Sequence, residues 1–297
     1  MSRPPAQETQ KAPGSWLAVC VGLSVAVLAW FGYAAIREWQ RTSLLLADRR
    51  AKEGVDLLVT ALTRDMEGVQ HSVLSSGDWN EFMLDPPYDV INLVARAFSR
   101  YPYPESFFAW HDVQPAAPTV FFHRRDRLPT WTAPESGPNR FPVVVDYHAP
   151  FAQPVLDRIH VAAREGRRFA VFETELGGSR YQVVARLLYR NGLPQDLAAV
   201  FGFTVNLPWA RHYYFPDLAQ QIGRLDDATA GIALAIVDGH GEPVARWTAA
   251  QSLGRVNRRS FPVLFFDPSL VTTNPPGDLS RDLWFVQAAA SDDPTLG

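Results

Sequence analysis

The segment RRFAVFETELGGSRYQVVARLLYRNGLPQDLAAVFGFTVNL, residues 167–207, decides the fold. Three runs rich in apolar and β-branched residues lie at 167–175, 180–190 and 197–207, and this composition is typical of strands. The connections LGGS and NGLPQD are short and contain glycine, as tight hairpin turns require. Strands joined in this way run antiparallel, so the segment predicts a three-stranded antiparallel meander.

Further strands and helices precede the meander. Residues 105–112 and 119–128 predict two strands joined by a Pro-Ala loop, and the proline-rich stretch 128–142 predicts an irregular connection. Helices are expected at 89–100 and 151–166, the second with one apolar face. We therefore predict an α+β fold in which an antiparallel sheet has its helices gathered on one face.

A second, smaller sheet unit is predicted after the first. The segment GIALAIVDGHGEPVARW, residues 231–247, predicts a strand, a tight turn at Asp238-Gly239 and a second strand. His240 lies at the tip of this hairpin, and we expect it to be solvated rather than catalytic. Two more strands are expected at 259–268 and 281–290. The larger unit is predicted to span 77–225, with a helix from 208 to its end, and the smaller unit 226–297.

A transmembrane helix is predicted at 15–36, after a cytoplasmic tail at 1–14. From Trp16 to Ile36 the chain has 21 consecutive uncharged residues. As a helix they would span about 31 Å, the thickness of a bilayer core. A cleaved signal peptide is the alternative, but this apolar run is too long and large residues occupy the place of a cleavage site. The cations after the span outnumber those before it, which alone favours the C-terminal side inside.

Residues 37–76 predict one long juxtamembrane helix. Apolar residues recur at helical spacing between charged ones, and they form what we call the apolar seam: Val55, Leu58, Leu62, Val69 and Val73. Such a seam pairs with the same helix of a second chain in a homodimer, or packs on its own domain. The sequence leaves both arrangements open.

Composition excludes several functions. The 297 residues are 47% hydrophobic, enough for a substantial core, and their net charge of −3 supplies no basic field for nucleic acid. A single cysteine, Cys20, excludes a disulfide framework and a cysteine zinc site within one chain. Motifs of hydrolases, zinc proteases, nucleotide-binding loops and kinases do not occur, so neither an enzyme nor a cofactor is expected.

Scattered charged residues give no acid/base or metal constellation. His111 and His123 could meet across a strand pair, but two ligands do not close a metal site, and no metal is expected. Glu173 and Glu175 share one face of a strand, which we interpret as solvated. A basic cluster beside a strand end is likewise expected to be exposed. Its members are Arg124, Arg125 and Arg127.

A ligand, if one binds, is expected on the larger sheet. The candidate binding residues are Trp110, Arg186, Tyr181, Phe203 and Trp79. Tyr181 and Arg186 lie five residues apart on one strand and so point to opposite faces, and Arg186 with Trp110 is the favoured pair. An arginine among apolar neighbours needs a carboxylate or an anionic ligand, and an internal salt bridge is favoured. Trp79 either covers the pocket or packs the helix onto the sheet.

A membrane anchor, a long helix, a ββαβββ unit and a smaller unit containing IALAIVDGHGEPVARW follow one another. This organisation, over residues 15–297, resembles the extracytoplasmic sensor region of bacterial membrane-bound sensor histidine kinases of the tandem Cache or PAS-like type. The resemblance implies an inner-membrane protein whose two units sense a small molecule in the periplasm for a two-component system. The orientation across the membrane rests mainly on this resemblance.

The end of the chain departs from that plan. SDDPTLG, residues 291–297, predicts a helix start, so we expect a sensor truncated before a second span and without its kinase core. The alternative function is a membrane-anchored interaction or structural module without a small-molecule ligand, and a membrane-tethered hydrolase comes third. Exposed apolar area on the second unit would favour the interaction module, whereas a closed polar pocket would favour the sensor.

Overall fold

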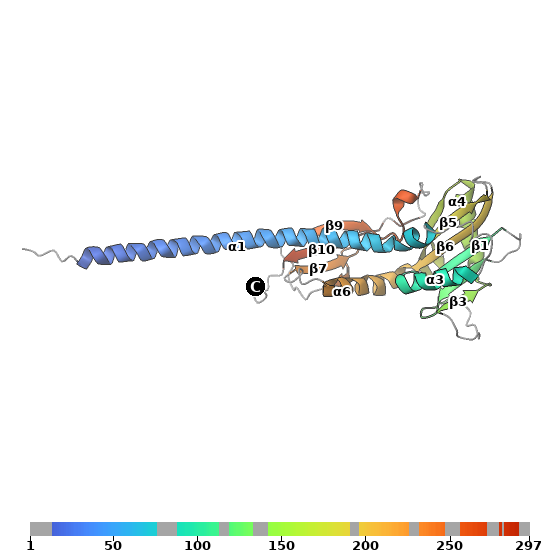
Figure 1. The fold of residues 1–297 in the computed structure, drawn as a ribbon, viewed down its shortest axis with the longest axis horizontal. Coiled ribbons are helices and arrows are strands. Elements are labelled where there is room, and N and C mark those ends of the chain that lie inside the picture. The colour runs from blue at the N-terminus through green and yellow to red at the C-terminus, as the bar shows by residue number, and fades with distance from the viewer. Residues whose placement is uncertain are drawn as a thin grey trace, which may run out of the picture. The chain divides into compact units, whose positions relative to one another are not determined.

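The computed structural model describes residues 14–75, 88–112, 119–132, 142–190, 196–225, 232–246, 256–271, 279–280 and 282–290 (Figure 1). The chain divides into two compact units, residues 1–50 and 51–297. Both sheets lie in the second unit. The segment 77–87, at the predicted start of the larger unit, and the segment 291–297, where we predicted a helix start, lie outside the described residues.

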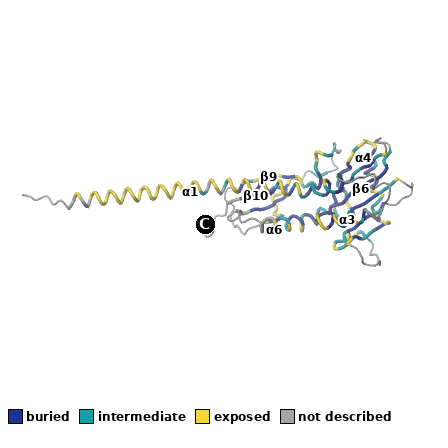
Figure 2. The backbone as a smooth tube through the Cα atoms, in the orientation of Figure 1, coloured by how far each residue is buried: buried dark blue, intermediate teal, exposed yellow. Residues whose placement is uncertain are grey.

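Helix α1 runs without interruption over Gly14–Met66. Its part from residue 19 to 36 exposes large apolar side chains, among them Leu28 at 71% and Trp30 at 70% (Figure 2). By length and composition, α1 is the one helix in the described part of the chain that is apolar enough to cross a membrane. Apolar surface of this extent is unfavourable in water and is typical of a segment that meets lipid.

The larger sheet has six antiparallel strands in the order β3-β2-β1-β6-β5-β4. The strands are β1 Ser106–His111, β2 Val120–Arg124, β3 Val143–Asp146, β4 Phe169–Leu176, β5 Ser179–Tyr189 and β6 Leu197–Asn206. The predicted meander is confirmed as β4-β5-β6, and the α+β fold class is confirmed with it. Strand β3 was not predicted, and β2 ends four residues earlier than expected.

Helices cover both faces of this sheet, so the prediction that they gather on one face is wrong. On β5, Val183 and Ala185 pack with helix α4, Ala152–Arg164. Val184 faces the other way and packs with α1 and with helix α3, Tyr88–Arg100. Since neighbouring residues of a strand point to opposite faces, a central strand apolar at nearly every position has to be buried on both sides.

The smaller sheet has four antiparallel strands in the order β8-β7-β10-β9. They are β7 Ile232–Val237, β8 Pro243–Arg246, β9 Asn257–Pro262 and β10 Leu283–Ala290. The predicted hairpin is confirmed as β7-β8. The chain reaches this sheet through the short helix α5, Leu207–Trp209, a wide helical turn η3, Ala210–Tyr214, and helix α6, Phe215–Leu225. Together these three confirm the helix predicted from residue 208 to 225.

The apolar seam packs within its own unit. Val55, Leu58, Leu62 and Val69 are at most 2% exposed and belong to a core cluster that contains residues of both sheets. After Met66 the chain continues into the wide turn η1, Gln70–Leu74, closed by a bond from Ser75 N to Gln70 O of 2.9 Å. Of the two arrangements left open by the sequence, the structure shows the seam on its own domain.

Polar contacts join the same helix to each sheet. On the six-stranded side, the hydroxyl of Tyr103 donates to Met66 O at 2.9 Å and accepts from Val69 N at 3.0 Å. On the four-stranded side, Arg259 of β9 donates to Asp56 at 2.5 Å. The segment after Ala51 is therefore a partner shared by both sheets.

Replacing Tyr103 by phenylalanine tests the contact of the helix with the segment that leads into β1 of the six-stranded sheet. Tyr103 is fully buried, so Tyr103→Phe leaves Val69 N and Met66 O without their partner. We expect the free energy of unfolding to fall by about 1–3 kcal/mol, measured by chemical denaturation of the full chain in detergent. Tyr213→Phe, at a side chain 62% exposed, is the matched control and should change it by less than about 0.5 kcal/mol. Equal effects of the two variants would contradict this role of Tyr103.

Candidate functional site

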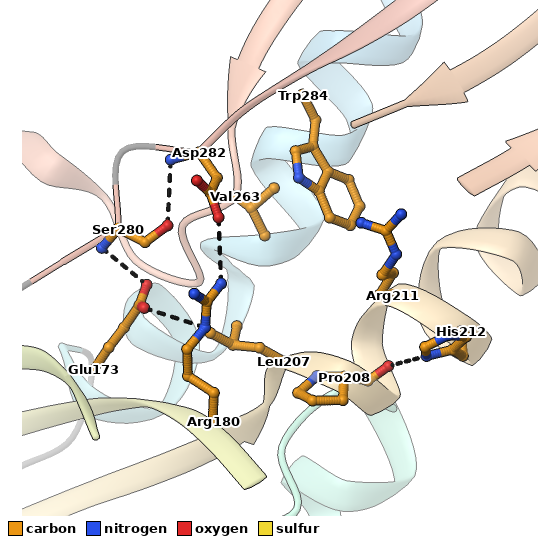
Figure 3. Close-up of a pocket in the computed structure, with 10 residues that line it drawn as sticks. All are labelled: Glu173, Arg180, Leu207, Pro208, Arg211, His212, Val263, Ser280, Asp282 and Trp284. Atoms are coloured by element: carbon orange, nitrogen blue, oxygen red, sulfur yellow. Dashed lines mark hydrogen bonds and ion pairs between the residues drawn. The ribbon is translucent and has the colours of Figure 1, made fainter. Parts of the chain in front are cut away.

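A cavity of about 290 Å³ lies where the two sheets meet (Figure 3). We call it the junction cavity. Its wall is built from β4, β5, the α5–η3 segment and the part of the chain around β9 and β10. Its volume is at the lower end of small-molecule sites, which range over about 300–1,000 Å³.

One side of the junction cavity is a chain of charges from sheet to sheet. Arg180 on β5 lies 3.5 Å from Glu173 on β4 and 3.2 Å from Asp282 just before β10. Glu173 also accepts a bond from Ser280 N at 3.2 Å. Partial burial raises the pKa of Glu173, and Arg180 works against that rise. The predicted solvated face is thus right for Glu175, which is exposed, and wrong for Glu173, whose side chain is 12% exposed.

The opposite side carries a second arginine. Arg211 on η3 pairs with Asp238 at 2.6 Å, and its guanidinium carbon lies 5.5 Å from the ring centre of Trp284. His212 Nδ1 lies 2.7 Å from the carbonyl oxygen of Pro208 and so acts as the donor, which leaves Nε2 for other partners. Leu207, Val263 and the Trp284 ring supply the apolar wall between the two charged sides.

The β7-β8 hairpin positions Arg211 through Asp238. Asp238 Oδ1 accepts bonds from His240 N and Glu242 N, both at 2.9 Å, while Oδ2 faces Arg211. Burial opposes ionisation of Asp238, but these hydrogen bonds outweigh it and hold its pKa below the ordinary value. The turn takes its positive φ, 86°, at Gly241. His240 at the tip is exposed, as predicted, and the residue of the turn that contacts Arg211 is Asp238.

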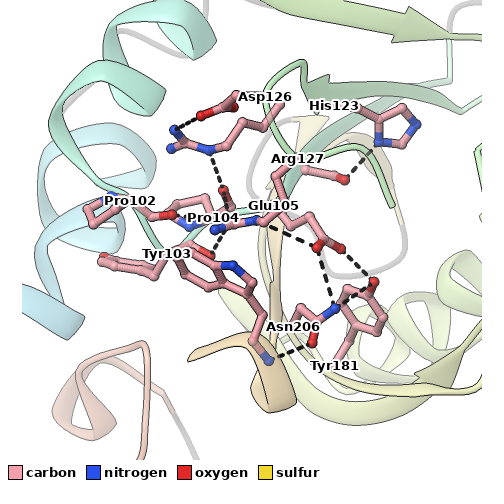
Figure 4. Close-up of polar contacts among 12 residues, drawn as sticks. Pro102, Tyr103, Pro104, Glu105, His123, Asp126, Arg127, Tyr181 and Asn206 are labelled. Carbon is pink, nitrogen blue, oxygen red and sulfur yellow. Dashed lines mark hydrogen bonds and ion pairs between the residues drawn. The ribbon is translucent and has the colours of Figure 1, made fainter. Parts of the chain in front are cut away.

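A buried polar network holds helix α5, which forms part of the cavity wall, in position (Figure 4). Glu105, 3% exposed, accepts bonds from the Tyr181 hydroxyl at 2.5 Å and Asn206 Nδ2 at 3.4 Å. Arg127 Nε lies 3.6 Å from the same carboxylate. Burial raises the pKa of Glu105, and the bonds and Arg127 oppose that rise. Asn206 Oδ1 then caps α5 by accepting from Trp209 N at 3.0 Å.

The basic cluster beside β2 is only partly exposed. Arg127 stacks over the Trp209 ring at 3.4 Å and donates to the carbonyl oxygens of Tyr103 and Pro104. Arg124 donates to backbone carbonyls of the same region, including Phe98 O at 2.9 Å. Burial lowers the pKa of Arg127 to about 10. The expected exposure is therefore wrong for Arg124 and Arg127, which hold the loop between α3 and β1.

The favoured pair of ligand residues, Trp110 and Arg186, does not come together. Trp110 packs toward α4, with its ring 5.4 Å from that of His160. Arg186 lies on the opposite face of the sheet, and its Nη1 donates to the carbonyl oxygen of Leu74 in η1. The sequence predicted a carboxylate or an anionic ligand as the partner of Arg186, and the structure shows a helix-end carbonyl, Leu74 O, among its partners.

The other predicted ligand residues are also apart. Tyr181 points away from Arg186, as expected, and its hydroxyl donates to the carboxylate of Glu105. Phe203 is a fully buried core residue on the α1 face, and Trp79 lies outside the described residues. His111 and His123 do not meet, because His123 is opposite Ser106 and His111 is opposite Ala199.

The residues of the junction cavity were not identified from the sequence. The sequence pattern indicated a solvated face for Glu173, while Arg211, Asp282 and Trp284 lie on segments far apart in the chain. A sequence signal existed only for Asp238, whose turn brings Arg211 into place.

No protein-family model matches the sequence, and none of the curated proteins does either. Similar solved structures exist at low identity. The periplasmic sensory domain of the Campylobacter jejuni chemoreceptor Tlp1 is 10% identical, with 84% of this chain and 93% of that chain covered and a TM-score of 0.33.

Two more similar structures are of the same kind. The ligand-binding domain of the Pseudomonas aeruginosa amino-acid chemoreceptor PctC, in complex with GABA, is 14% identical over 80% of this chain and 95% of that one, with a TM-score of 0.37. The extracellular domain of a candidate histidine kinase is 14% identical over 84% and 97%, with a TM-score of 0.33.

The buried His123 predicts a pH dependence of stability. Burial lowers its pKa from 6.5 to about 4, although Asp146 works in the opposite direction. The folded chain therefore keeps this ring neutral while the unfolded chain protonates it, so stability is lost as the pH falls from 6.5 toward about 4. One such group contributes at most about 1.4 kcal/mol per pH unit.

Urea unfolding of the full chain across this pH range measures the effect, with His123→Gln as the comparison. The variant should show a shallower dependence on pH than the wild type. Nuclear magnetic resonance of the His123 ring gives an independent reading, and titration near pH 6.5 in the folded chain would show the expectation to be wrong.

Proposed function

We propose that this chain is the ligand-sensing input module of a bacterial membrane-bound signalling protein. The N-terminal part of α1 anchors it in the inner membrane, and the two sheets lie in the periplasm. One observation carries the proposal: the helix that contains the apolar span also contributes residues 51–66 to the core shared by both sheets. A change between the sheets therefore reaches that helix through direct contacts.

The junction cavity is the proposed ligand site. It places Glu173 and Asp282, with Arg180 between them, on one side and Arg211 on the other, and Trp284 is part of its apolar wall. Carboxylates attract an ammonium group, and a guanidinium offers a forked pair of donors to a carboxylate. A small zwitterion of the amino-acid class fits this arrangement of charges, and an apolar side chain would lie against Trp284 and Val263.

Ligand binding changes the helix only if the ligand prefers one arrangement of the sheets over another. The cavity wall comes from both sheets, so a bound molecule favours the arrangement in which both sides reach it. Arg259 and Asp56 link the smaller sheet to α1, while Tyr103 links the larger one. Relative movement of the sheets is therefore transmitted to α1 at two positions along the helix, Asp56 and Met66.

The interaction-module alternative has less support. In the described part of the smaller unit, the exposed large hydrophobic residues are Val256 at 39% and Leu283 at 48%. Pairing of two chains through the helix remains a proposal. Because the apolar seam is occupied, a dimer has to use another face, such as that of Leu57, which is 67% exposed.

A thermal-shift screen tests the ligand site. The full chain in detergent is mixed with a panel of α-amino acids and with GABA, and at least one is expected to raise the unfolding temperature by a few degrees. Asp282→Asn removes a charge at a half-exposed cavity position and should weaken that ligand at least about tenfold in calorimetric titration. Asp217→Asn, at an exposed aspartate on α6, is the matched control and should bind as the wild type does.

Two results would contradict the proposed site. One is the absence of any stabilising molecule in a panel that includes acidic, basic, apolar and ω-amino acids. The other is equal ligand affinity in Asp282→Asn and Asp217→Asn, which would place the ligand elsewhere on the chain.

A further inference from the structure

Three ligand-type side chains converge where the end of the long helix meets the smaller sheet. Glu67 and His71 are one helical turn apart, because Glu67 N bonds to Thr63 O and His71 N bonds to Glu67 O. Asp267 comes from the connection after β9, where it caps the short helix η5, Pro268–Leu270. One carboxylate oxygen or ring nitrogen from each residue lies within 4.8 Å of the others.

Asp267 is held in a fixed orientation. Its Oδ1 accepts from Ser269 N at 2.8 Å, and its backbone N donates to Gln70 Oε1 at 2.6 Å. The second carboxylate oxygen, Oδ2, then lies 3.3 Å from His71 Nε2. Ligand residues of metal sites are oriented by such bonds to their other atoms, which fix the carboxylate before the ion arrives.

The distances suit a small transition-metal ion. Zinc binds nitrogen and oxygen at about 2.0–2.2 Å in a tetrahedron, so neighbouring ligand atoms lie about 3.3–3.5 Å apart. The Asp267–His71 separation of 3.3 Å already has this value. Glu67 is half-buried, and one of its carboxylate oxygens lies within 4.8 Å of the ligand atoms of His71 and Asp267. Since the His71 side chain is 49% exposed, water can reach the fourth position.

The charges also favour a cation. Two carboxylates face one imidazole, and the repulsion from Asp267 adds to burial in raising the pKa of Glu67. A His71–Asp267 ion pair alone would explain their short distance but not the third ligand beside it. Calcium and magnesium prefer six or more oxygen ligands, whereas a site with one imidazole and two carboxylates suits zinc or a similar ion.

We propose that Glu67, His71 and Asp267 bind one divalent transition-metal ion of the zinc type. The ion ties the η1 end of the long helix to the connection that follows β9. None of the three residues lines the junction cavity, so this site is separate from the proposed ligand site. Metal occupancy strengthens the contact between the helix and the smaller sheet and thereby adjusts how movement of that sheet reaches the membrane anchor.

Metal titration of the full chain tests this site. The chain is purified in detergent through an affinity tag without histidine, treated with chelator, and titrated with Zn²⁺, Co²⁺ and Mg²⁺. We expect one Zn²⁺ per chain and an unfolding temperature raised by about 5 °C at saturation, with no such effect of Mg²⁺. Bound Co²⁺ should show the visible absorption of a four-coordinate ion.

The variants separate this site from adventitious binding. His71→Ala and Asp267→Asn should each weaken Zn²⁺ at least about tenfold. Asp267→Asn keeps an oxygen to cap η5, so it tests the ligand role even if the histidine variant does not fold. His240→Ala removes an exposed histidine elsewhere and should bind Zn²⁺ as the wild type does.

The proposal is overturned if Zn²⁺ leaves the unfolding temperature of the wild type unchanged, or if Asp267→Asn binds Zn²⁺ as tightly as His240→Ala. The first result would leave His71 and Asp267 as a simple ion pair. Neither result bears on amino-acid binding in the junction cavity, so the two proposals stand or fall separately.

Discussion

Burial of the apolar seam of the long helix against two sheets is the constraint on which the rest of the structure depends. Each large apolar side chain removed from water contributes about 1.5–3 kcal/mol, and the apolar seam provides five of them within residues 55–73. Because the same core cluster contains Phe203 of the larger sheet and Phe261 of the smaller one, neither sheet can leave the helix without exposing that seam. The position of each sheet is therefore fixed by its packing on this one helix.

The way the helix ends follows from the same packing. The last carbonyl groups of a helix have no partner within it and carry partial negative charge. Here Met66 O accepts from the Tyr103 hydroxyl, and Leu74 O accepts from Arg186 on β5. Arg186 on β5 thus donates to a helix-end carbonyl, and burial lowers its pKa only to about 10, so it stays charged at neutral pH. The larger sheet supplies the polar groups that the helix end needs.

The sequence allowed the strands to be predicted where local signals were sufficient. The meander at 167–207 has apolar runs and glycine turns, and both are properties of neighbouring residues. Strand β3, Val143–Asp146, has only four residues after a proline-rich stretch, too few for a clear period. The prediction that Trp110 and Arg186 lie together was wrong because it depends on the strand register. Trp110 lies opposite Val200, and Val200 lies opposite Leu187. Trp110 therefore shares a face of the sheet with Leu187 and not with Arg186.

Arginine burial and the junction cavity could not be predicted, for a related reason. The partners of Arg127 include backbone carbonyls more than twenty residues away, and carbonyl positions leave no trace in the sequence. The cavity needs β4, η3 and β10 at once, and their relative positions depend on the whole core. Only Asp238 gave a local sign, since an aspartate before a glycine predicts a turn whatever lies around it.

Between the sheets, polar contacts lie beside aromatic packing such as that of Phe265 on Tyr103, whose ring centres are 4.9 Å apart. The buried amide of Gln182 on β5 accepts from Phe265 N at 2.7 Å, and Arg180 reaches Asp282 at 3.2 Å. A hydrogen bond of this kind contributes about 0.5–1.5 kcal/mol net, and an exposed ion pair less. A ligand bound with micromolar affinity brings about 8 kcal/mol, so even a modest preference for one arrangement outweighs several such contacts. A ligand in the proposed site that prefers one arrangement of the sheets therefore brings enough free energy to change the polar contacts between them.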